Sequence, residues 1–276
     1  QTCALSIYIS LSSTLNITPS GILNLAGDIT NNGDLVFQSD ASGTGQLAEF
    51  LGSITGDVSV ERYIPAKRSF RLVSSAVGGA TIADSWQQNT HITGLDGVTN
   101  GFDATTSNNP SMFSFDNTIA DQSNGAAWQA VTSTSTMITA GTPYRLMVRG
   151  DRSIDLKDNA AVATPTTLSA TGTMLTGSFS PTLATAAHHY SFVGNPYHAV
   201  VDFNAVTKTN LTGYLYIWDA TIAGANGNGG FTVVDASDGS EVTSISPYSS
   251  DANQYIMPGQ AFFVQNKAAG NANITF

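Results

Sequence analysis

Three aspartates in one short loop have the spacing that most resembles a metal site. Asp151, Asp155 and Asp158 supply carboxylate oxygens, which are the ligands that Ca²⁺ prefers. The loop lacks the alternating acids, the glycine and the terminal glutamate of an EF-hand, and Arg152 and Lys157 bring positive charge into it. Two interpretations stay open: a calcium site, with Ca²⁺ as the one candidate cofactor, or a solvated turn held by local ion pairs.

A group of aromatic residues offers a second candidate site. Tyr214, Tyr216 and Trp218 alternate along one segment, so a strand there would place all three rings on the same face. An exposed stripe of rings would be a ligand-binding face, with a glycan as the candidate ligand. A buried stripe would belong to the core instead, and the sequence leaves both interpretations open.

Charged residues are scarce, at 11% of the chain, yet several lie where they could meet. Arg145, Arg149 and Asp151 share one face of a predicted strand, and Glu61 and Arg62 lie in another. We expect these five residues to form a buried or half-buried ion-pair network that holds the fold together.

No recognised catalytic motif is present. The sequence has no Gly-x-Ser-x-Gly nucleophile turn, no phosphate-binding loop and no dinucleotide-binding fingerprint. Glycoside hydrolysis needs paired carboxylates that most often include Glu, and Glu occurs only at Glu49, Glu61 and Glu241. We therefore expect a protein that is not an enzyme.

The composition indicates a core but neither nucleic-acid binding nor a transmembrane segment. Hydrophobic residues make up 41% of the 276 residues, whereas the net charge of −10 repels phosphate backbones. No apolar run reaches the roughly 18 residues that a transmembrane helix needs. The single cysteine, Cys3, excludes an internal disulfide.

The elements that must position these residues are predicted to be strands. Ser, Thr, Asn and Gly supply most of the polarity and good helix formers are few, which is typical of short strands joined by turns. Residues 1–60 have the spacing of a short β-solenoid or a tight meander. Residues 61–276 predict a β-sandwich or jelly roll. The expected fold is therefore all-β, in two regions.

A set of segments spans nearly the whole chain in order: Gly27–Gly33, Ser53–Val58, Val60–Pro65, Gly101–Thr105, Gly141–Asp151, Phe192–Tyr197 and Pro258–Gln265. Together they resemble a repeat or stalk-like module of exported, adhesin-like cell-surface proteins of the Bacteroidota, especially flavobacteria. Those proteins are substrates of the type IX secretion system. The resemblance implies an extracellular location at the cell surface, and it implies location better than activity.

The leading hypothesis is a non-catalytic structural or adhesive surface protein, with self-assembly into a filament as one form of it. The terminal strands Leu5–Ile9 and Asn273–Phe276 could pair between copies, because unpaired strand edges seek partners. The expected partners are other copies or other cell-surface components. The alternative is a carbohydrate-binding module that uses the aromatic face, with Ca²⁺ as its candidate cofactor.

Overall fold

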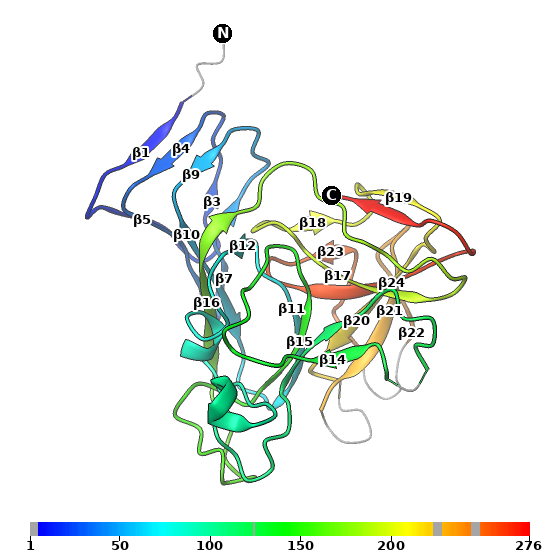
Figure 1. Cartoon of the computed structure of the whole chain (residues 1–276). Helices are drawn as coiled ribbons and strands as arrows, with labels where there is room; N and C mark the ends of the chain where they lie inside the picture. Colours follow the sequence, from blue (N-terminus) through cyan, green and yellow to red (C-terminus); the bar gives the residue numbers. More distant parts are fainter. Residues whose placement is uncertain (1–4, 124, 223–227, 244–248) are drawn as a thin grey trace.

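The computed structural model of the protein describes residues 5–123, 125–222, 228–243 and 249–276 (Figure 1). Strands make up 38% and helices 3%, which confirms the all-β class predicted from the sequence. Within these residues the helical elements are two short 3-10 helices, η1 (Trp86–Gln88) and η2 (Gly97–Asn100). None of them is long and apolar enough to cross a membrane. Cys3 lies outside the described residues.

The N-terminal strands form two coils and the start of a third. The first coil consists of β1 (Ile7–Ile9), β2 (Thr14–Ile17) and β3 (Ile22–Leu23). The second consists of β4 (Ile29–Asn31), β5 (Asp34–Phe37) and β8 (Gln46–Leu47), with a hairpin of β6 (Ser39–Asp40) and β7 (Gly43–Thr44) before β8. The third begins with β9 (Ile54–Thr55) and β10 (Val58–Ile64).

Strands of successive coils lie parallel and in register. Ile7 pairs with Ile29, and Ile29 in turn pairs with Ile54. Parallel stacking is the pairing of a solenoid, whereas a meander pairs successive strands antiparallel. Because side chains alternate across a strand, every second residue points inward, and these residues stack into apolar ladders between the coils.

Strand β10 joins the coils to the rest of the chain. One of its edges pairs parallel with β5, and the other pairs antiparallel with β16 (Thr166–Met174) along its whole length. β12 (Val77–Gly78) completes this sheet beside β16. The boundary predicted between residues 60 and 61 falls inside β10, and one hydrophobic cluster, here the N-terminal cluster, runs from Ile9 to Met174 across it. The division of the chain at this point stays a prediction.

Two antiparallel sheets follow and pack face to face. The middle sheet contains β11 (Ser69–Val73), β15 (Tyr144–Val148), β13 (Met112–Phe115) and β14 (Trp128–Ala130). The outer sheet contains β17 (Tyr190–Gly194), β24 (Ala261–Gln265), β20 (Tyr214–Asp219), β21 (Gly230–Asp235) and β22 (Glu241–Thr243). Such packing is the arrangement of a β-sandwich. The jelly-roll topology stays a prediction.

Both faces of the middle sheet are covered. Leu72 lies with Phe192 and Phe263 in an aromatic cluster between the middle and outer sheets. Leu146 and Val148, on the opposite face, belong to the N-terminal cluster, which also contains residues of β10 and β16. The sheet of β10 and β16 is therefore a third layer, which the sequence did not predict.

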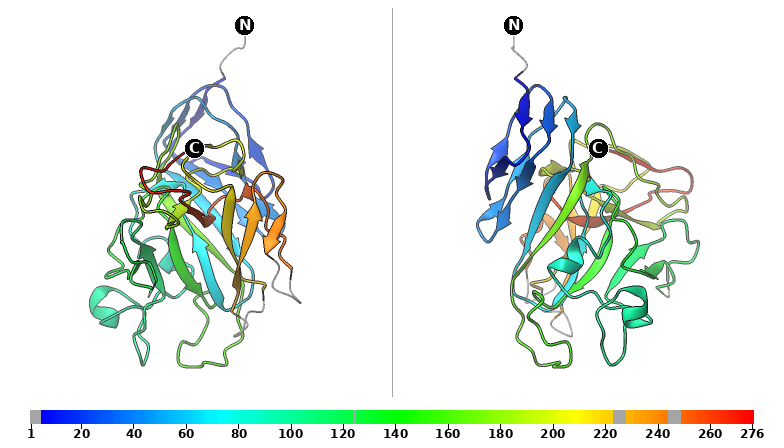
Figure 2. Two further views of the ribbon diagram at one scale, coloured as in Figure 1. Left: turned by 90° about the vertical axis from the view of Figure 1, so that its right-hand side faces the viewer. Right: turned by 60° about the vertical axis from the view of Figure 1, so that its left-hand side comes forward.

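Short strands close the outer face of the molecule at its C-terminal side. They are β18 (Val201–Asp202) paired with β23 (Tyr255–Ile256), and β19 (Thr207–Thr209) paired with β25 (Asn273–Thr275). Phe203 and Phe262 lie in the core beneath them. Figures 1 and 2 show the coils at one end of the molecule, with β1 on the side that faces away from the C-terminal strands.

Candidate functional site

The aromatic residues of β20 do share one face, as the sequence predicted, but their exposure differs along the strand. Tyr214 is 39% exposed. Tyr216 is half-buried, donates its hydroxyl to Gln265 Oε1 at 3.1 Å and meets the ring of Tyr190 edge-on, with centroids 5.0 Å apart. Burial, followed by the neighbouring tyrosines, raises the pKa of Tyr216 to about 12. Tyr216 is therefore a neutral hydrogen-bond donor at the edge of the core.

Trp218, on the same face, is half-buried. Its ring meets Phe231 edge-on at 5.1 Å, and it packs with Tyr216 against the aromatic cluster. The indole Nε1 is buried and has no hydrogen-bond acceptor. Tyr216 and Trp218 are thus half-buried, and the more open rings beside them are those of Tyr214 and the adjacent Tyr190, which is 36% exposed.

The acidic loop is built from separate turns and differs from the predicted calcium site. Asp151 Oδ1 accepts from the backbone N–H of Ser153 at 2.9 Å. Asp155 and Asp158 accept in the same way from the second residue after each, at 2.9 and 2.7 Å. No group of three or more acidic, His or Cys side chains that could hold a metal occurs among the described residues. Each carboxylate stabilises its own turn, because Asp readily bonds to the backbone two residues on.

The predicted ion-pair network of Glu61, Arg62, Arg145, Arg149 and Asp151 does not form. Among the described residues, none of these five makes an ion pair. Glu61 instead accepts from the backbone N–H of Ser39 at 2.9 Å, which ties β10 to the hairpin of the second coil.

Arg145 is held by aromatic rings instead of carboxylates. Its guanidinium carbon lies 4.1 Å from the centroid of Trp128 and 4.6 Å from those of Phe70 and Phe113. The negative faces of these rings attract the cation, while burial lowers the pKa of Arg145. This face of β15 packs against aromatic rings, and among the described residues no carboxylate forms an ion pair with Arg145.

A buried histidine lies beside Arg62, where the coils meet the C-terminal part. His198 is 4% exposed, its ring meets Phe37 edge-on at 5.3 Å, and its Nε2 has no partner. Burial, and then the positive charge of Arg62, lower the pKa of His198 to about 3. The imidazole is therefore neutral at any physiological pH, and it packs as a core residue.

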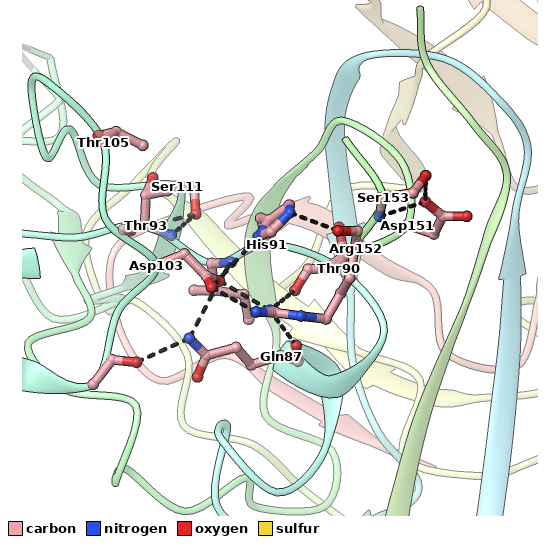
Figure 3. A network of polar contacts seen from close by, with 12 residues as sticks. Gln87, Thr90, His91, Thr93, Asp103, Thr105, Ser111, Asp151, Arg152 and Ser153 are labelled. Carbon is pink, nitrogen blue, oxygen red and sulfur yellow. Dashed lines mark hydrogen bonds and ion pairs between the residues drawn. The ribbon is translucent and has the colours of Figure 1, made fainter. Parts of the chain in front are cut away.

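A polar network that the sequence analysis missed is centred on Asp103 (Figure 3). Arg152 donates to Asp103 from both terminal guanidinium nitrogens, Nη2 and Nη1, at 2.7 and 3.1 Å. The Ile92 backbone N–H and Gln87 Nε2 donate to the same carboxylate at 2.9 and 3.3 Å. Burial alone would raise the pKa of Asp103, but these bonds outweigh it and hold the pKa below its usual value.

His91 completes this network without forming a catalytic dyad. Its Nδ1 lies 3.4 Å from Asp103 Oδ1, outside hydrogen-bond geometry, and its Nε2 lies 3.2 Å from the backbone oxygen of Arg152. A general base would need Nε2 to face a nucleophile or a substrate. The network instead joins the segment around residues 87–103 to the turn at 150–153, where Thr90 also donates to the Gly150 carbonyl at 2.6 Å.

An apolar cavity of about 450 Å³ lies between the second coil and the C-terminal part. The segments 47–51, 174–178 and 197–201 line it together with Phe276. Leu51, at the second coil, is 90% exposed. Ligand pockets usually combine such an apolar wall with a few convergent polar groups, and this cavity offers few of them.

Among the residues that the structure describes, strands pair with the first coil on one side only. β1 and β2 each end the order of their sheets, and β3 pairs with β8 alone. Ile7 and Leu15 are half-buried, whereas Ile29 and Leu35, their partners in the second coil, are each 1% exposed. The apolar ladders are therefore less covered at Ile7 and Leu15, although Ile9 and Ile17 of the same two strands are buried.

The backbone of the first coil also presents unused hydrogen-bonding groups. Ile7 N–H donates to Asp28 and the Ile9 carbonyl accepts from Asn32, both at 2.9 Å. Because alternate peptide groups of a strand point to opposite edges, the N–H and C=O of Tyr8 point to the open side. Large apolar side chains on this coil are exposed as well: Leu5, Tyr8, Leu11 and Ile22 are 67, 68, 80 and 63% exposed.

The C-terminal strand has less edge to offer. β25 pairs with β19, and on its other side Phe276 and Phe179 exchange two backbone hydrogen bonds, at 2.9 and 3.3 Å. Of the two terminal strands predicted to pair between copies, the N-terminal one therefore has the open edge.

The chain matches no protein-family model, no curated protein and no solved structure. The proposed function therefore rests on the geometry of the molecule.

Proposed function

We propose that this chain is a non-catalytic structural or adhesive module of an extracellular surface protein, and that it self-associates through its first coil. The observation that carries the proposal is the open end of the coils. There, exposed apolar side chains and outward backbone groups without a strand partner among the described residues occur together. The location at a Bacteroidota cell surface, with export by type IX secretion, is supported by the resemblance of its segments.

Strand addition is the mechanism that this surface favours. A strand laid along β1, β2 or β3 would receive the outward N–H and C=O groups and cover the exposed apolar side chains. Parallel coils end in an edge that attracts other strands unless it is capped by polar residues, charges or proline. The first coil is mixed in this respect: Tyr8, Leu11 and Ile22 are apolar and exposed, whereas Thr14, Asn16 and Pro19 lie between them.

A second copy of this chain is the partner to which we commit, joined first coil to first coil. The opposite side of the coils is occupied at β10, which pairs with β16, and at Leu47, whose N–H donates to the His198 carbonyl at 2.9 Å; only the two-residue strand β9 ends its sheet there. A symmetric pairing uses the same surface twice and needs no second edge. A filament would need another contact, and Phe179 already covers one side of β25.

Tyr8→Pro tests this proposal. Proline removes the outward N–H of residue 8 but leaves the bonds of Ile7 and Ile9 to β4 intact, so the fold should survive. We expect the wild-type chain to dimerise in sedimentation velocity runs and the variant to dissociate at least about tenfold more readily, which is roughly 1.4 kcal/mol.

Tyr8→Thr is the matched control, because it also removes the tyrosine ring but keeps the N–H and a strand-forming residue. It should dimerise far more tightly than Tyr8→Pro. A wild-type chain that stays monomeric at millimolar concentration would contradict the proposal, as would a Tyr8→Pro variant that associates like the wild type.

The alternative, carbohydrate binding at the aromatic face of β20, is favoured by one observation. Tyr214 and Tyr190 expose part of their rings beside Tyr216. Trp218, the largest ring of the predicted face, packs against the aromatic cluster, so the strand-addition proposal has the stronger support.

A further inference from the structure

A polar cavity lies beside the Asp103 network. Its volume is about 240 Å³, and two segments line it, 93–109 and 149–159. Pockets for drug-sized ligands usually measure roughly 300–1,000 Å³, so this one suits a single small molecule.

Two cations line this cavity without a partner. The side chains of Arg149 and Lys157 make no hydrogen bond or ion pair with any described residue. Arg68 lies close by and donates to the backbone oxygen of Asn159 at 3.1 Å. Burial, and then the positive charge of Arg68, lower the pKa of Arg149. Lys157 is exposed, so Arg149 is the half-buried cation of this cavity that has no partner among the described residues.

No carboxylate lines the cavity to neutralise these cations. The acids nearest in sequence to Lys157 are Asp155 and Asp158, and each accepts from the backbone of its own turn. A half-buried guanidinium without a counter-ion loses hydration and gains nothing in return. Binding an anion would remove that cost and would use the guanidinium's paired N–H groups.

Neutral polar groups complete the lining. The side chains of Thr106, Ser107 and Asn109 have no hydrogen-bond partner among the described residues, so they are available to hydroxyl groups of a ligand. The wall that carries them is held in place, because Thr93 donates its hydroxyl to the Asn109 carbonyl at 2.7 Å and Asn108 bonds back to Thr105.

The Asp103 network holds the two walls together. Arg152 and Asp103 join the segments that carry Arg149 and Thr93, both of which line the cavity (Figure 3). The two walls that carry the cations and the hydroxyl groups are therefore held together by hydrogen bonds.

We propose that this cavity binds the carboxylate or sulfate group of a small, hydroxyl-rich anion such as an acidic sugar. Arg149 and Lys157 bind the anionic group. Ser107 and Asn109 bind neighbouring hydroxyls. This is a ligand site independent of the first coil.

Calorimetric titration of the full chain at low ionic strength tests the inference, with glucuronate, inorganic sulfate and glucose as probes. We expect glucuronate to bind with one-to-one stoichiometry, sulfate to bind more weakly and glucose not to bind. Loss of a charged hydrogen bond should weaken glucuronate binding at least about tenfold in Arg149→Gln. Lys157→Gln, at an exposed position, should weaken it without affecting folding.

Lys267→Gln is the matched control, because it removes one exposed positive charge elsewhere, and it should bind like the wild type. If sulfate binds as tightly as glucuronate, the cavity is an oxyanion site, and the claim that it recognises a sugar is contradicted. If glucose binds as tightly as glucuronate, the claim that the cavity recognises an anionic group is contradicted. The whole inference fails if neither anion binds, or if Arg149→Gln and Lys157→Gln bind glucuronate unchanged while remaining folded by circular dichroism.

Discussion

Asp103 and Arg152, which lie 49 residues apart in the sequence, form the one carboxylate–guanidinium ion pair of the described residues. The Asp103 side chain is shielded from solvent, whereas the Arg152 side chain, which donates from Nη1 and Nη2, is 41% exposed. The pair stabilises because the carboxylate also receives backbone and amide N–H groups, which satisfies its remaining lone pairs.

Asp103→Asn should destabilise the chain by about 1–3 kcal/mol at neutral pH, because it removes charge-assisted bonds at a shielded site. The folded-state pKa of Asp103 is lowered. Its contribution is therefore full above the unfolded value of about 3.9, and it is lost as the pH falls through the folded pKa. Urea unfolding of variant and wild type across pH measures the difference.

Asp57→Asn is the control for this prediction, since Asp57 is exposed and its side chain has no partner among the described residues. It should change stability by less than about 0.5 kcal/mol. A difference between the wild type and Asp103→Asn that persists undiminished at pH 2 would show that the charge of Asp103 is not its source.

At this scale the sequence predicts which side chains share a strand face, but it does not predict which residues those side chains contact. The shared face of Tyr214, Tyr216 and Trp218 followed from the period of a strand. That Arg145 meets aromatic rings depends on which sheet packs opposite β15, and this is a tertiary fact. Asp103 lies in a loop with no local pattern, so no signal pointed to Arg152.

At the scale of elements, one glycine shows how closely the coils stack. Gly56 follows β9 with a φ of +94°, and a Cβ there would lie 1.9 Å from the backbone oxygen of Asn31 in the coil beside it. Asn31, itself buried, donates to the Asp57 carbonyl at 2.6 Å and so ties the same two coils together.

Gly56→Ala should therefore destabilise the chain by about 2 kcal/mol or more, through backbone strain and the clash with Asn31. Gly213→Ala is the matched control, because Gly213 has no positive φ and a Cβ there would meet nothing within 4 Å. Urea unfolding should show little change for that control. Equal stability of the two variants would mean that the coils can separate at Gly56 without cost.

The strands of the coils were predictable because turn residues divide residues 1–60 into short apolar pieces. Their parallel stacking was one of two patterns compatible with that texture, since spacing alone does not decide between a solenoid and a meander. The antiparallel pairing of β10 with β16 joins residues more than 100 positions apart, and no local signal encodes it.

At the scale of the whole molecule, the first coil lies at one end and the packed sheets lie at the other (Figures 1 and 2). The packed sheets form three layers, with separate clusters of buried side chains. Among the described residues, no strand pairs with the first coil on its outer side, and Leu5, Tyr8, Leu11 and Ile22 are exposed there. The proposal of self-association rests on this contrast between the two ends.

Amide hydrogen exchange measured by NMR at low and high protein concentration tests this claim most directly. The N–H groups of Ile7 and Ile9 bond within the coils and should be protected at both concentrations. The outward N–H groups of Tyr8, Asn16 and Ile22 should exchange rapidly in the dilute protein and become protected at least about tenfold when it is concentrated. Outward amides that remain equally unprotected at every concentration would contradict pairing through the first coil.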